Sequence, residues 1–269
     1  MTNKIKLVAL DLDGTLLNSS KEISRENIEA IDAARDKGVD VVLTTGRPLI
    51  AIQPFLKRLN MLDFDDYSVT FNGGLVQRNT GQILSKKSFS YEEIEEIKTL
   101  TSRLDIPCDI LSEEKVFVTK SARVSEYETL NKLLTFIKMD FNDVPREVVY
   151  NKIVSCTERE FLDESLKQIP AEFFSRFEIF KTQAKLLEFM PKGINKAYGL
   201  TQLIGQLDLQ PENVMAMGDE ANDLSMIAWA GYGVAMGNAV DSVKEQANII
   251  SSLTNDQNAV ADIIEKYVL

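Results

Sequence analysis

The chain of 269 residues contains no histidine. This absence excludes a Ser-His-Asp triad, histidine-ligated zinc sites and phosphohistidine chemistry. The two cysteines, Cys108 and Cys156, form no CxxC pair, and no arginine stands six positions after either one. Thiolate-based phosphate chemistry is therefore not expected, and both cysteines lie in apolar, strand-like runs where we expect them to be buried. Any catalysis must rest on carboxylates, a lysine and a metal.

Long apolar runs and an excess of positive charge are also missing. No segment approaches the ~20 apolar residues of a membrane-spanning helix, and the N-terminal MTNKIK has no apolar signal-peptide region, so we expect a cytoplasmic protein without a membrane partner. The net charge of −11 argues against nucleic acid, whose phosphates are bound by clustered Lys and Arg. A small anionic ligand fits, because a local site can be positive within an acidic chain. The sequence leaves monomer and homodimer open.

The composition is that of a soluble globular protein with a sizeable core, with 44% apolar and 26% charged residues, and its length favours two domains. Strands expected at 7–10, 39–44 and 67–71 alternate with helices, which predicts a Rossmann-like parallel sheet with right-handed crossovers. From about 84 to 192 a helix-strand-strand rhythm, including a helix near 127–137, predicts an inserted α+β domain. We therefore assign 1–83 and 193–269 to a core domain and 84–192 to the insert.

Two carboxylates follow the first expected strand. Asp11 and Asp13 come directly after the apolar run Leu7–Leu10 and before Gly14-Thr15. Ligands of open α/β sheets bind at the carboxyl ends of strands, and carboxylates at this spacing can converge on an oxygen-liganded cation such as Mg²⁺. One of them could also attack a substrate as a nucleophile. A surface turn that merely ends the strand is the alternative.

Polar residues also follow the second expected strand, where Thr45-Gly46 offers a hydroxyl and a backbone N–H that suit a phosphate oxygen. Further along the chain, Lys196 is expected in the first turn of a helix, where the helix dipole opposes a cation. A nearby anion is the simplest reason for a lysine at that position. An ordinary strand-to-helix turn and a solvated surface lysine are the alternatives.

A last polar cluster, Asp219, Asn222 and Asp223, falls within one turn at the carboxyl end of the apolar strand 214–217. These side chains can add a metal ligand and a polar clamp to a site at Asp11. A capping aspartate is the alternative, but it would not account for both Asn222 and Asp223.

These motifs resemble those of the haloacid dehalogenase (HAD) superfamily, in that family's order. The residues that carry the resemblance are Asp11-Leu12-Asp13-Gly14-Thr15, Thr45-Gly46-Arg47, Lys196 and Gly218-Asp219-x-x-Asn222-Asp223. Asn72-Gly73-Gly74 and the insert between the second and third motifs look like the Cof-type subgroup, close to its sugar-phosphate phosphatases. The resemblance spans almost the whole chain and implies a parallel-sheet HAD core with an inserted α+β cap of the C2 type. Asp13 also separates a phosphotransferase-like site from the dehalogenases.

The resemblance implies a role for each of these residues. Asp11 would attack phosphorus to give an aspartyl phosphate, and Asp13 would protonate the leaving alcohol and then deprotonate water. Mg²⁺ would be held by the Asp11 carboxylate, the Asp13 backbone carbonyl and Asp219, supported by Asp223. The groups expected to hold phosphoryl oxygens are Leu12, Thr45, Gly46, Lys196 and Asn222, and the candidates for substrate contact are Arg47 and Asn72.

The expected function is a Mg²⁺-dependent phosphatase of small phosphorylated metabolites, with sugar phosphates first. A phosphatase for a flavin precursor or pyridoxal phosphate is an alternative that differs only in the cap. A phosphomutase shares the aspartyl-phosphate step. A non-catalytic phosphometabolite-binding regulator is a further alternative, but a mere binder has no need of an acid/base, Asp13, next to a nucleophile, Asp11.

Overall fold

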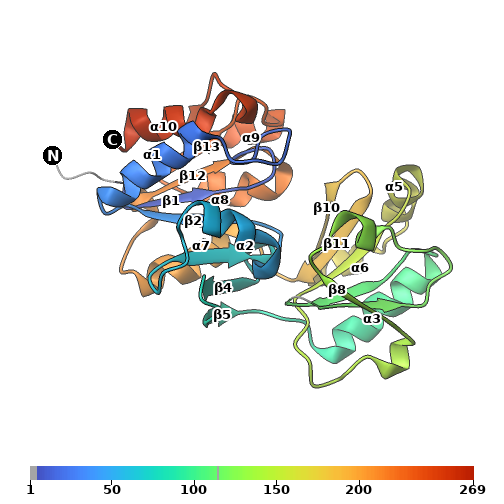
Figure 1. The fold of residues 1–269 in the computed structure, drawn as a ribbon. Helices are drawn as coiled ribbons and strands as arrows, with labels where there is room; N and C mark the ends of the chain where they lie inside the picture. The colour runs from blue at the N-terminus through green and yellow to red at the C-terminus, as the bar shows by residue number, and fades with distance from the viewer. Residues whose placement is uncertain (1–4, 114) are drawn as a thin grey trace. The chain divides into compact units, whose positions relative to one another are not determined.

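The computed structural model describes residues 5–113 and 115–269, and the chain divides into two units (Figure 1). The core unit contains Met1–Arg47, Ile52–Lys86 and Asn195–Leu269, and the insert unit contains Pro48–Ala51 and Lys87–Ile194. The core unit is thus built from both ends of the chain. In Figure 1 the blue helix α1 (Arg25–Asp36) and the red helix α10 (Ala259–Tyr267) lie side by side, and they pack against each other.

The core unit is organised around a sheet that has eight strands among the described residues, in the order β14-β13-β12-β1-β2-β3-β4-β5. The strands from β14 to β3 are parallel, and the hairpins that add β4 and β5 are antiparallel. Their bounds are Leu7–Leu10 (β1), Asp40–Thr44 (β2), Tyr67–Thr70 (β3), Leu75–Arg78 (β4), Ile83–Lys86 (β5), Val214–Gly218 (β12), Tyr232–Ala235 (β13) and Ile249–Ile250 (β14). All four residues of β1 are buried, as expected for a strand that is covered on both faces.

Helices cover both faces of this sheet, with α1 and α10 on one side and α7 (Lys196–Gln206) on the other (Figure 1). Helix α1 begins where the Ser24 side chain accepts a hydrogen bond from the Asn27 N–H, 3.2 Å away. It ends before Gly38, whose φ of 76° suits a residue without a Cβ. The remaining helices of this unit are α2 (Leu49–Arg58, from Ile52 on), α8 (Leu224–Trp229), α9 (Asp241–Gln246), and the 3₁₀ turns η1 (Phe71–Gly73), η3 (Pro211–Asn213), η4 (Ala221–Asp223) and η5 (Asn255–Gln257).

The insert unit has a second sheet, of six strands in the described part of the chain, in the order β10-β11-β9-β6-β7-β8. Its apolar face packs on α3 and α5 and includes Ile153, Leu187 and Phe189. Helix α3 starts with a capping box, in which the side chains of Ser90 and Glu93 each accept a hydrogen bond from the other residue's backbone N–H. The bounds are Asp109–Ser112 (β6), Lys115–Thr119 (β7), Thr135–Met139 (β8), Lys152–Cys156 (β9), Phe177–Gln183 (β10), Leu186–Pro191 (β11), Tyr91–Arg103 (α3), Tyr127–Leu130 (α4), Phe141–Asp143 (η2), Arg159–Lys167 (α5) and Ala171–Arg176 (α6).

The prediction of a helix near 127–137 is wrong beyond its first turn. Helix α4 stops at Leu130, and Asn131 leaves the helical region with φ −134° and ψ 67°. The chain then forms β8, which pairs in parallel with β7. The apolar spacing of this segment fits a helix, but its β-branched and aromatic residues, Thr135 to Ile137, also suit a strand. The neighbouring strand decides between the two, and sequence periodicity does not contain that information.

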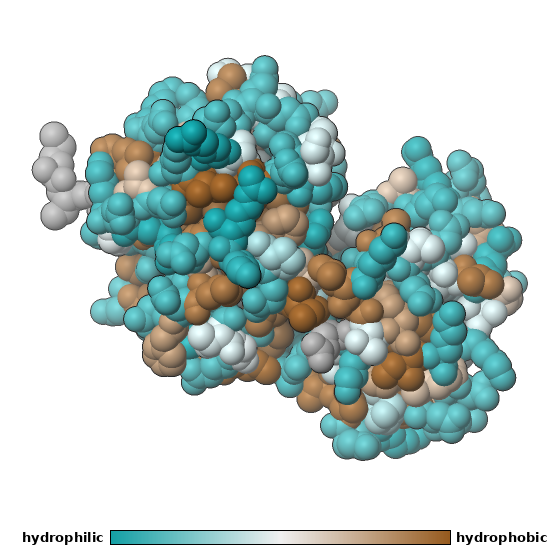
Figure 2. Space-filling view, in the orientation of Figure 1, coloured by the Kyte–Doolittle hydropathy of each residue, from teal (hydrophilic) through white to brown (hydrophobic). Residues whose placement is uncertain are grey.

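Hydrophilic residues cover most of the face seen in Figure 2, in keeping with the charged composition. Among the described residues, no helix has the length and apolar content needed to cross a membrane. Both cysteines are buried, as expected. Burial raises the pKa of the Cys108 thiol to about 11 and that of Cys156 to about 12, so neither is a ready thiolate at neutral pH.

Candidate active site

The carboxyl ends of three neighbouring strands meet at one edge of the core sheet. Asp11 follows β1, Thr45 follows β2 and Asp219 follows β12. The strands are in register there, because Leu10 of β1 lies beside Leu43 of β2 and Met217 of β12. Ligands of open α/β sheets bind at this edge. The parallel order of the sheet therefore brings together motifs that lie more than 200 residues apart in the chain.

A buried acidic cluster lies at this edge. Asp11, Asp219 and Asp223 each offer a carboxylate oxygen, and these oxygens lie within 4.8 Å of one another. The ammonium group of Lys196, the first residue of α7, contacts oxygens of both Asp11 and Asp223. Lys196 and Asp223 are fully buried, and Asp11 and Asp219 are each 6% exposed. The anion expected near Lys196 at this helix start is therefore a pair of carboxylates, those of Asp11 and Asp223.

The electrostatics of the cluster show a surplus of negative charge. Burial raises the pKa of Asp11 well above its usual value; Lys196 opposes this shift, and the charges of Asp223 and Asp219 add to it. Burial and the charge of Asp223 raise the pKa of Asp219 to about 7. Burial lowers the pKa of Lys196, but the adjacent Asp11 and Asp223 outweigh it and raise that pKa above its ordinary value.

This cluster fits a divalent cation. Three carboxylates and one ammonium carry a net charge of −2 when all are ionised. Burial first, and then repulsion from the neighbouring carboxylates, raises the pKa values of Asp11 and Asp219. Oxygen ligands of this kind are those that Mg²⁺ takes in proteins. Asp11 and Asp219 were expected as ligands from the sequence. Asp223 was expected to support the metal without binding it, and its carboxylate lies within the same group.

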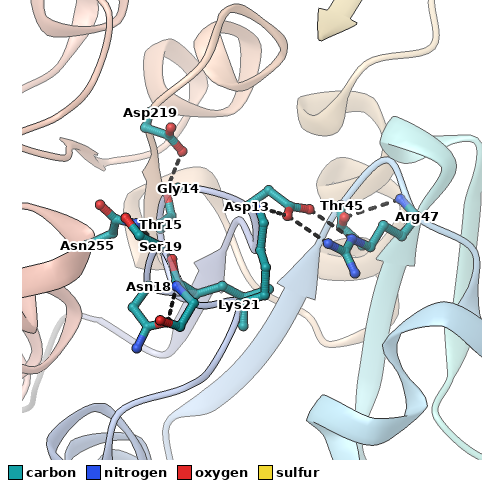
Figure 3. A network of polar contacts seen from close by, with 12 residues as sticks. Asp13, Gly14, Thr15, Asn18, Ser19, Lys21, Thr45, Arg47, Asp219 and Asn255 are labelled. Atoms are coloured by element: carbon teal, nitrogen blue, oxygen red, sulfur yellow. Dashed lines mark hydrogen bonds and ion pairs between the residues drawn. The ribbon is translucent and has the colours of Figure 1, made fainter. Parts of the chain in front are cut away.

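The turn after β1 is shaped to hold Asp219. Gly14 has φ +91°, and a Cβ there would lie 2.2 Å from Oδ2 of Asp219, so glycine allows the carboxylate to approach. The Thr15 hydroxyl donates a hydrogen bond to Oδ1 of Asp219 at 2.8 Å (Figure 3). Sequence reasoning treated Gly14-Thr15 as a turn and missed this contact. The position of Gly14-Thr15 directly after two aspartates was a signal that these residues belong to the site.

Asp223 holds both the lysine and the backbone of the turn after β12. While Oδ1 contacts Lys196, Oδ2 accepts hydrogen bonds from the backbone N–H groups of Asp219 at 2.9 Å and Glu220 at 3.0 Å. A Cβ at Gly218 would lie 2.5 Å from the Asp223 side chain. The sequence Gly218-Asp219-x-x-x-Asp223 therefore forms a tight turn that fixes the acidic cluster.

Asp13 lies in a different environment from Asp11. Its carboxylate accepts two hydrogen bonds from the Arg47 guanidinium, at 2.8 and 2.7 Å, and one from Lys21 at 2.8 Å (Figure 3). Burial raises the pKa of Asp13, but the hydrogen bonds and charges of Arg47 and Lys21 outweigh it and lower that pKa below its usual value. Sequence reasoning missed Lys21, an exposed residue with no motif around it.

The remaining predicted residues surround the same edge. Thr45 is 2% exposed, and its hydroxyl accepts a hydrogen bond from the Arg47 N–H at 3.2 Å. Asn222 donates a hydrogen bond from Nδ2 to Oδ1 of Asn72 at 3.1 Å, and Asn72 lies beside Gly46. The side chain of Leu12 is fully buried, so any contact of Leu12 with a ligand would be through its backbone.

Comparisons with known proteins identify the family of the chain. A family model described as haloacid dehalogenase-like hydrolase matches residues 8–264. The Bacillus subtilis protein named "Putative phosphatase YxeH" is 32% identical over 268 residues, 98% of each chain. The 5-amino-6-(5-phospho-D-ribitylamino)uracil phosphatase YcsE, also of Bacillus subtilis, is 34% identical over 266 residues, 98% of this chain and 96% of its own. A crystal structure of a haloacid dehalogenase-like hydrolase from Bacteroides thetaiotaomicron has a TM-score of 0.84 and 31% identity, covering 97% of this chain and 99% of that one. The chain therefore belongs to the haloacid dehalogenase-like hydrolase family.

Proposed function

We propose that this protein is a Mg²⁺-dependent phosphatase of small phosphorylated metabolites that works through an aspartyl phosphate. The observation that carries this proposal is the buried cluster of Asp11, Asp219, Asp223 and Lys196 at the sheet edge. Family membership supports it, because the matched family is one of hydrolases. A bound Mg²⁺, held by Asp11 and Asp219, would offset the repulsion between a carboxylate nucleophile and a phosphate.

In the proposed reaction, a carboxylate oxygen of Asp11 forms a bond to phosphorus as the bond to the substrate's ester oxygen breaks. Asp13 gives its proton to the leaving alkoxide, so that a neutral alcohol departs. Asp13 then takes a proton from a water molecule, whose oxygen attacks the phosphorus of the aspartyl phosphate. That attack releases inorganic phosphate and restores the Asp11 carboxylate.

The contacts of Asp13 set a requirement on the first step. The hydrogen bonds from Arg47 and Lys21 favour the ionised carboxylate, which is the form that acts as the base in the second step. To act as the acid, Asp13 must be protonated, and so it must give up contacts with Arg47. A substrate phosphate that attracts Arg47 would supply a reason for this exchange.

The phosphoryl oxygens would be held by groups that already surround the cluster. Lys196 supplies a buried positive charge, and Thr45 supplies a hydroxyl. The backbones of Gly46 and Leu12 supply N–H groups just after the ends of their strands. Asn222 supplies an amide. Donors that are fixed before reaction stabilise charge as it shifts in the transition state.

Two substrate classes deserve the first trials. Sugar phosphates are the class expected from the sequence, and a solved HAD subclass IIB sugar phosphatase, BT4131, shares the fold with a TM-score of 0.82 at 24% identity. The relative YcsE, by its name, acts on a phosphorylated ribitylamino-uracil, which favours a flavin precursor as the second candidate. Both are phosphate esters on a polyhydroxy chain. We propose that the insert unit selects between such leaving groups.

The test is phosphate release by the full chain with Mg²⁺ across sugar phosphates, the ribitylamino-uracil phosphate and pyridoxal phosphate, with and without a chelator. The Asp11→Asn variant should fold with a urea midpoint no lower than that of the wild type, because the amide keeps the shape and removes one buried negative charge from the cluster. It should release no phosphate, because the nucleophile is lost. Asp36→Asn, an exposed aspartate at the end of α1, serves as the matched control and should keep full activity.

Normal release by Asp11→Asn would remove Asp11 from the nucleophile role. Strong release from one substrate class alone would decide between sugar phosphates and the flavin precursor. Isomerised product without free phosphate would show a phosphomutase, and binding without turnover would show a regulator.

A further inference from the structure

The turn η1 (Phe71–Gly73) lies among three segments that carry proposed phosphate contacts. The backbone N–H of Asn72 donates to the carbonyl of Thr45 at 3.0 Å. The side chain of Asn72 accepts a hydrogen bond from Asn222 at 3.1 Å. Gly73 lies against the start of α7, since a Cβ on it would be 2.0 Å from the carbonyl oxygen of Asn195, which precedes Lys196. One short turn therefore contacts the segments after β2 and β12 and the beginning of α7.

The backbone of this turn has an unusual conformation. Phe71, Asn72 and Gly73 have φ values of 50°, 53° and 100°, so three consecutive residues lie in the left-handed region. Non-glycine residues adopt that region at a cost, and asparagine tolerates it better than most. Strained backbone of this kind is found where surrounding structure holds it, often at functional sites. Here the surrounding structure is the proposed phosphate site.

The Asn72 carboxamide is enclosed, and the residue is 1% exposed. Besides its hydrogen bond to Asn222, it lies next to Gly46, where a Cβ would be 3.1 Å from both the Oδ1 and the Nδ2 atoms of Asn72. An amide nitrogen has two N–H donors. The bond to Asn72 uses one donor of Asn222, fixes the plane of that amide, and leaves the second donor for a phosphoryl oxygen.

We propose that Asn72 is a positioning residue for the phosphate site. The Asn72 side chain holds the amide of Asn222 in one orientation. This role takes the place of the direct substrate contact that the resemblance implied for Asn72. This inference rests on the proposed function, because it assigns Asn72 an effect through residues that the proposed phosphatase would use to bind phosphate.

The test is a double-mutant cycle between Asn72→Gly and Asn222→Ala, with kcat and KM measured on the best substrate of the screen. Glycine keeps the positive φ without strain and removes only the carboxamide, so the turn should keep its shape. Asn72→Gly should lower kcat/KM by about three- to tenfold, the value of one neutral hydrogen bond. Asn222→Ala should lower kcat/KM by a larger factor. The kcat/KM of the double variant should equal that of Asn222→Ala within about twofold.

A second measurement separates positioning from general damage. The inhibition constant of inorganic phosphate should rise in Asn72→Gly, while the urea midpoint, followed by tryptophan fluorescence, stays near that of the wild type. Asn60→Gly is the matched control, because Asn60 is an exposed asparagine with φ 50° at the end of α2. The Asn60→Gly variant should change neither the inhibition constant of phosphate nor the urea midpoint.

Each outcome bears on one of the two proposals. An unchanged kcat/KM in Asn72→Gly overturns the positioning role, and so do losses from the two single variants that simply multiply in the double variant. Both results require an active wild type. A wild type that releases no phosphate from any ester tested refutes the phosphatase itself, so the two failures cannot be confused.

Discussion

Replacing Lys196 with methionine tests the electrostatic argument for the site most directly. The ammonium of Lys196 contacts Asp11 and Asp223, and the lysine is fully buried. Methionine fills a similar volume and carries no charge, so the change removes the cation and keeps the packing. The variant then holds three buried carboxylates within 4.8 Å of one another, with Asp219 as the third, and no ammonium between them.

The size of the effect follows from burial. Removing one partner of a buried ion pair costs about 3–5 kcal/mol, because the other charge is left uncompensated. With an m-value of about 2 kcal/mol per molar urea, a loss of about 4 kcal/mol lowers the unfolding midpoint by about 2 M. Folded domains have about 5–15 kcal/mol of stability in all, so the Lys196→Met variant should remain folded in water, but with a much smaller margin.

The measurement is urea unfolding followed by the fluorescence of Trp229. This is the single tryptophan of the chain, and it ends α8 in the core unit, so it reports on the unit that contains Lys196. Mg²⁺ should raise the midpoint of Lys196→Met more than that of the wild type, because the variant cluster has the larger negative surplus. Phosphate release should also fall.

Lys152→Met is the matched control. Lys152 forms a buried pair with Glu188 at 2.9 Å, with both side chains 3% exposed, in the sheet of the insert unit. Its loss should destabilise the insert unit, seen by circular dichroism, and leave the Trp229 transition and its response to Mg²⁺ unchanged. If Lys196→Met unfolds at the wild-type midpoint, or responds to Mg²⁺ no more than the wild type, the cluster does not carry a surplus of negative charge.

Two further predictions concern other carboxylates. Asp13→Asn should slow phosphate release by about 10²–10⁴-fold by removing proton transfer, and an unchanged rate at saturating substrate would contradict the acid/base role. Burial raises the pKa of Asp109 in the insert sheet to about 7, above the unfolded value of about 3.9, so the stability it contributes is present at low pH and is lost as pH rises through 7. The Asp109→Asn variant cannot ionise at this position. Its free energy of unfolding in urea titrations should exceed that of the wild type by about 1–3 kcal/mol at pH 8, and by less at pH 5. Equal unfolding midpoints at pH 8 would show that Asp109 ionises without cost.

Local signals in the sequence are sufficient for the parts of the fold that depend on a few adjacent residues. The apolar run Leu7–Leu10 was expected as a strand and is a buried parallel strand. In the structure, Ser24 and Ser90 cap helix starts and Gly38 follows a helix end, which are positions where these residue types are common. The expected α/β core follows from these elements, because parallel strands joined by right-handed crossovers leave few other arrangements. Strand β8 was missed, because its residues become a strand only through pairing with β7.

The site was predictable to a similar depth. Position at a strand end indicated that Asp11 and Asp219 lie close together, as they do, and the position of Lys196 at a helix start indicated a neighbouring anion. The contacts of Asp13 were not predictable, because its partners Arg47 and Lys21 come from a loop and a turn with no periodic pattern. Side-chain pairing of this kind depends on tertiary geometry, which spacing along the chain does not encode.

The two aspartates of the first motif illustrate what that geometry adds. The structure raises the pKa of Asp11 and lowers that of Asp13, whereas the proposed reaction needs an ionised Asp11 and, at first, a protonated Asp13. Proteins divide acid and base roles between paired carboxylates by giving the two opposed environments. In this site, the protonation preference of each of the two carboxylates must reverse before the proposed reaction can begin. A divalent cation beside Asp11 favours its ionised form, and transfer of Arg47 from Asp13 to a substrate phosphate lets Asp13 take up a proton. Substrate and metal would therefore each switch one of the two carboxylates, so that the nucleophile and the acid are ready together only when both are bound.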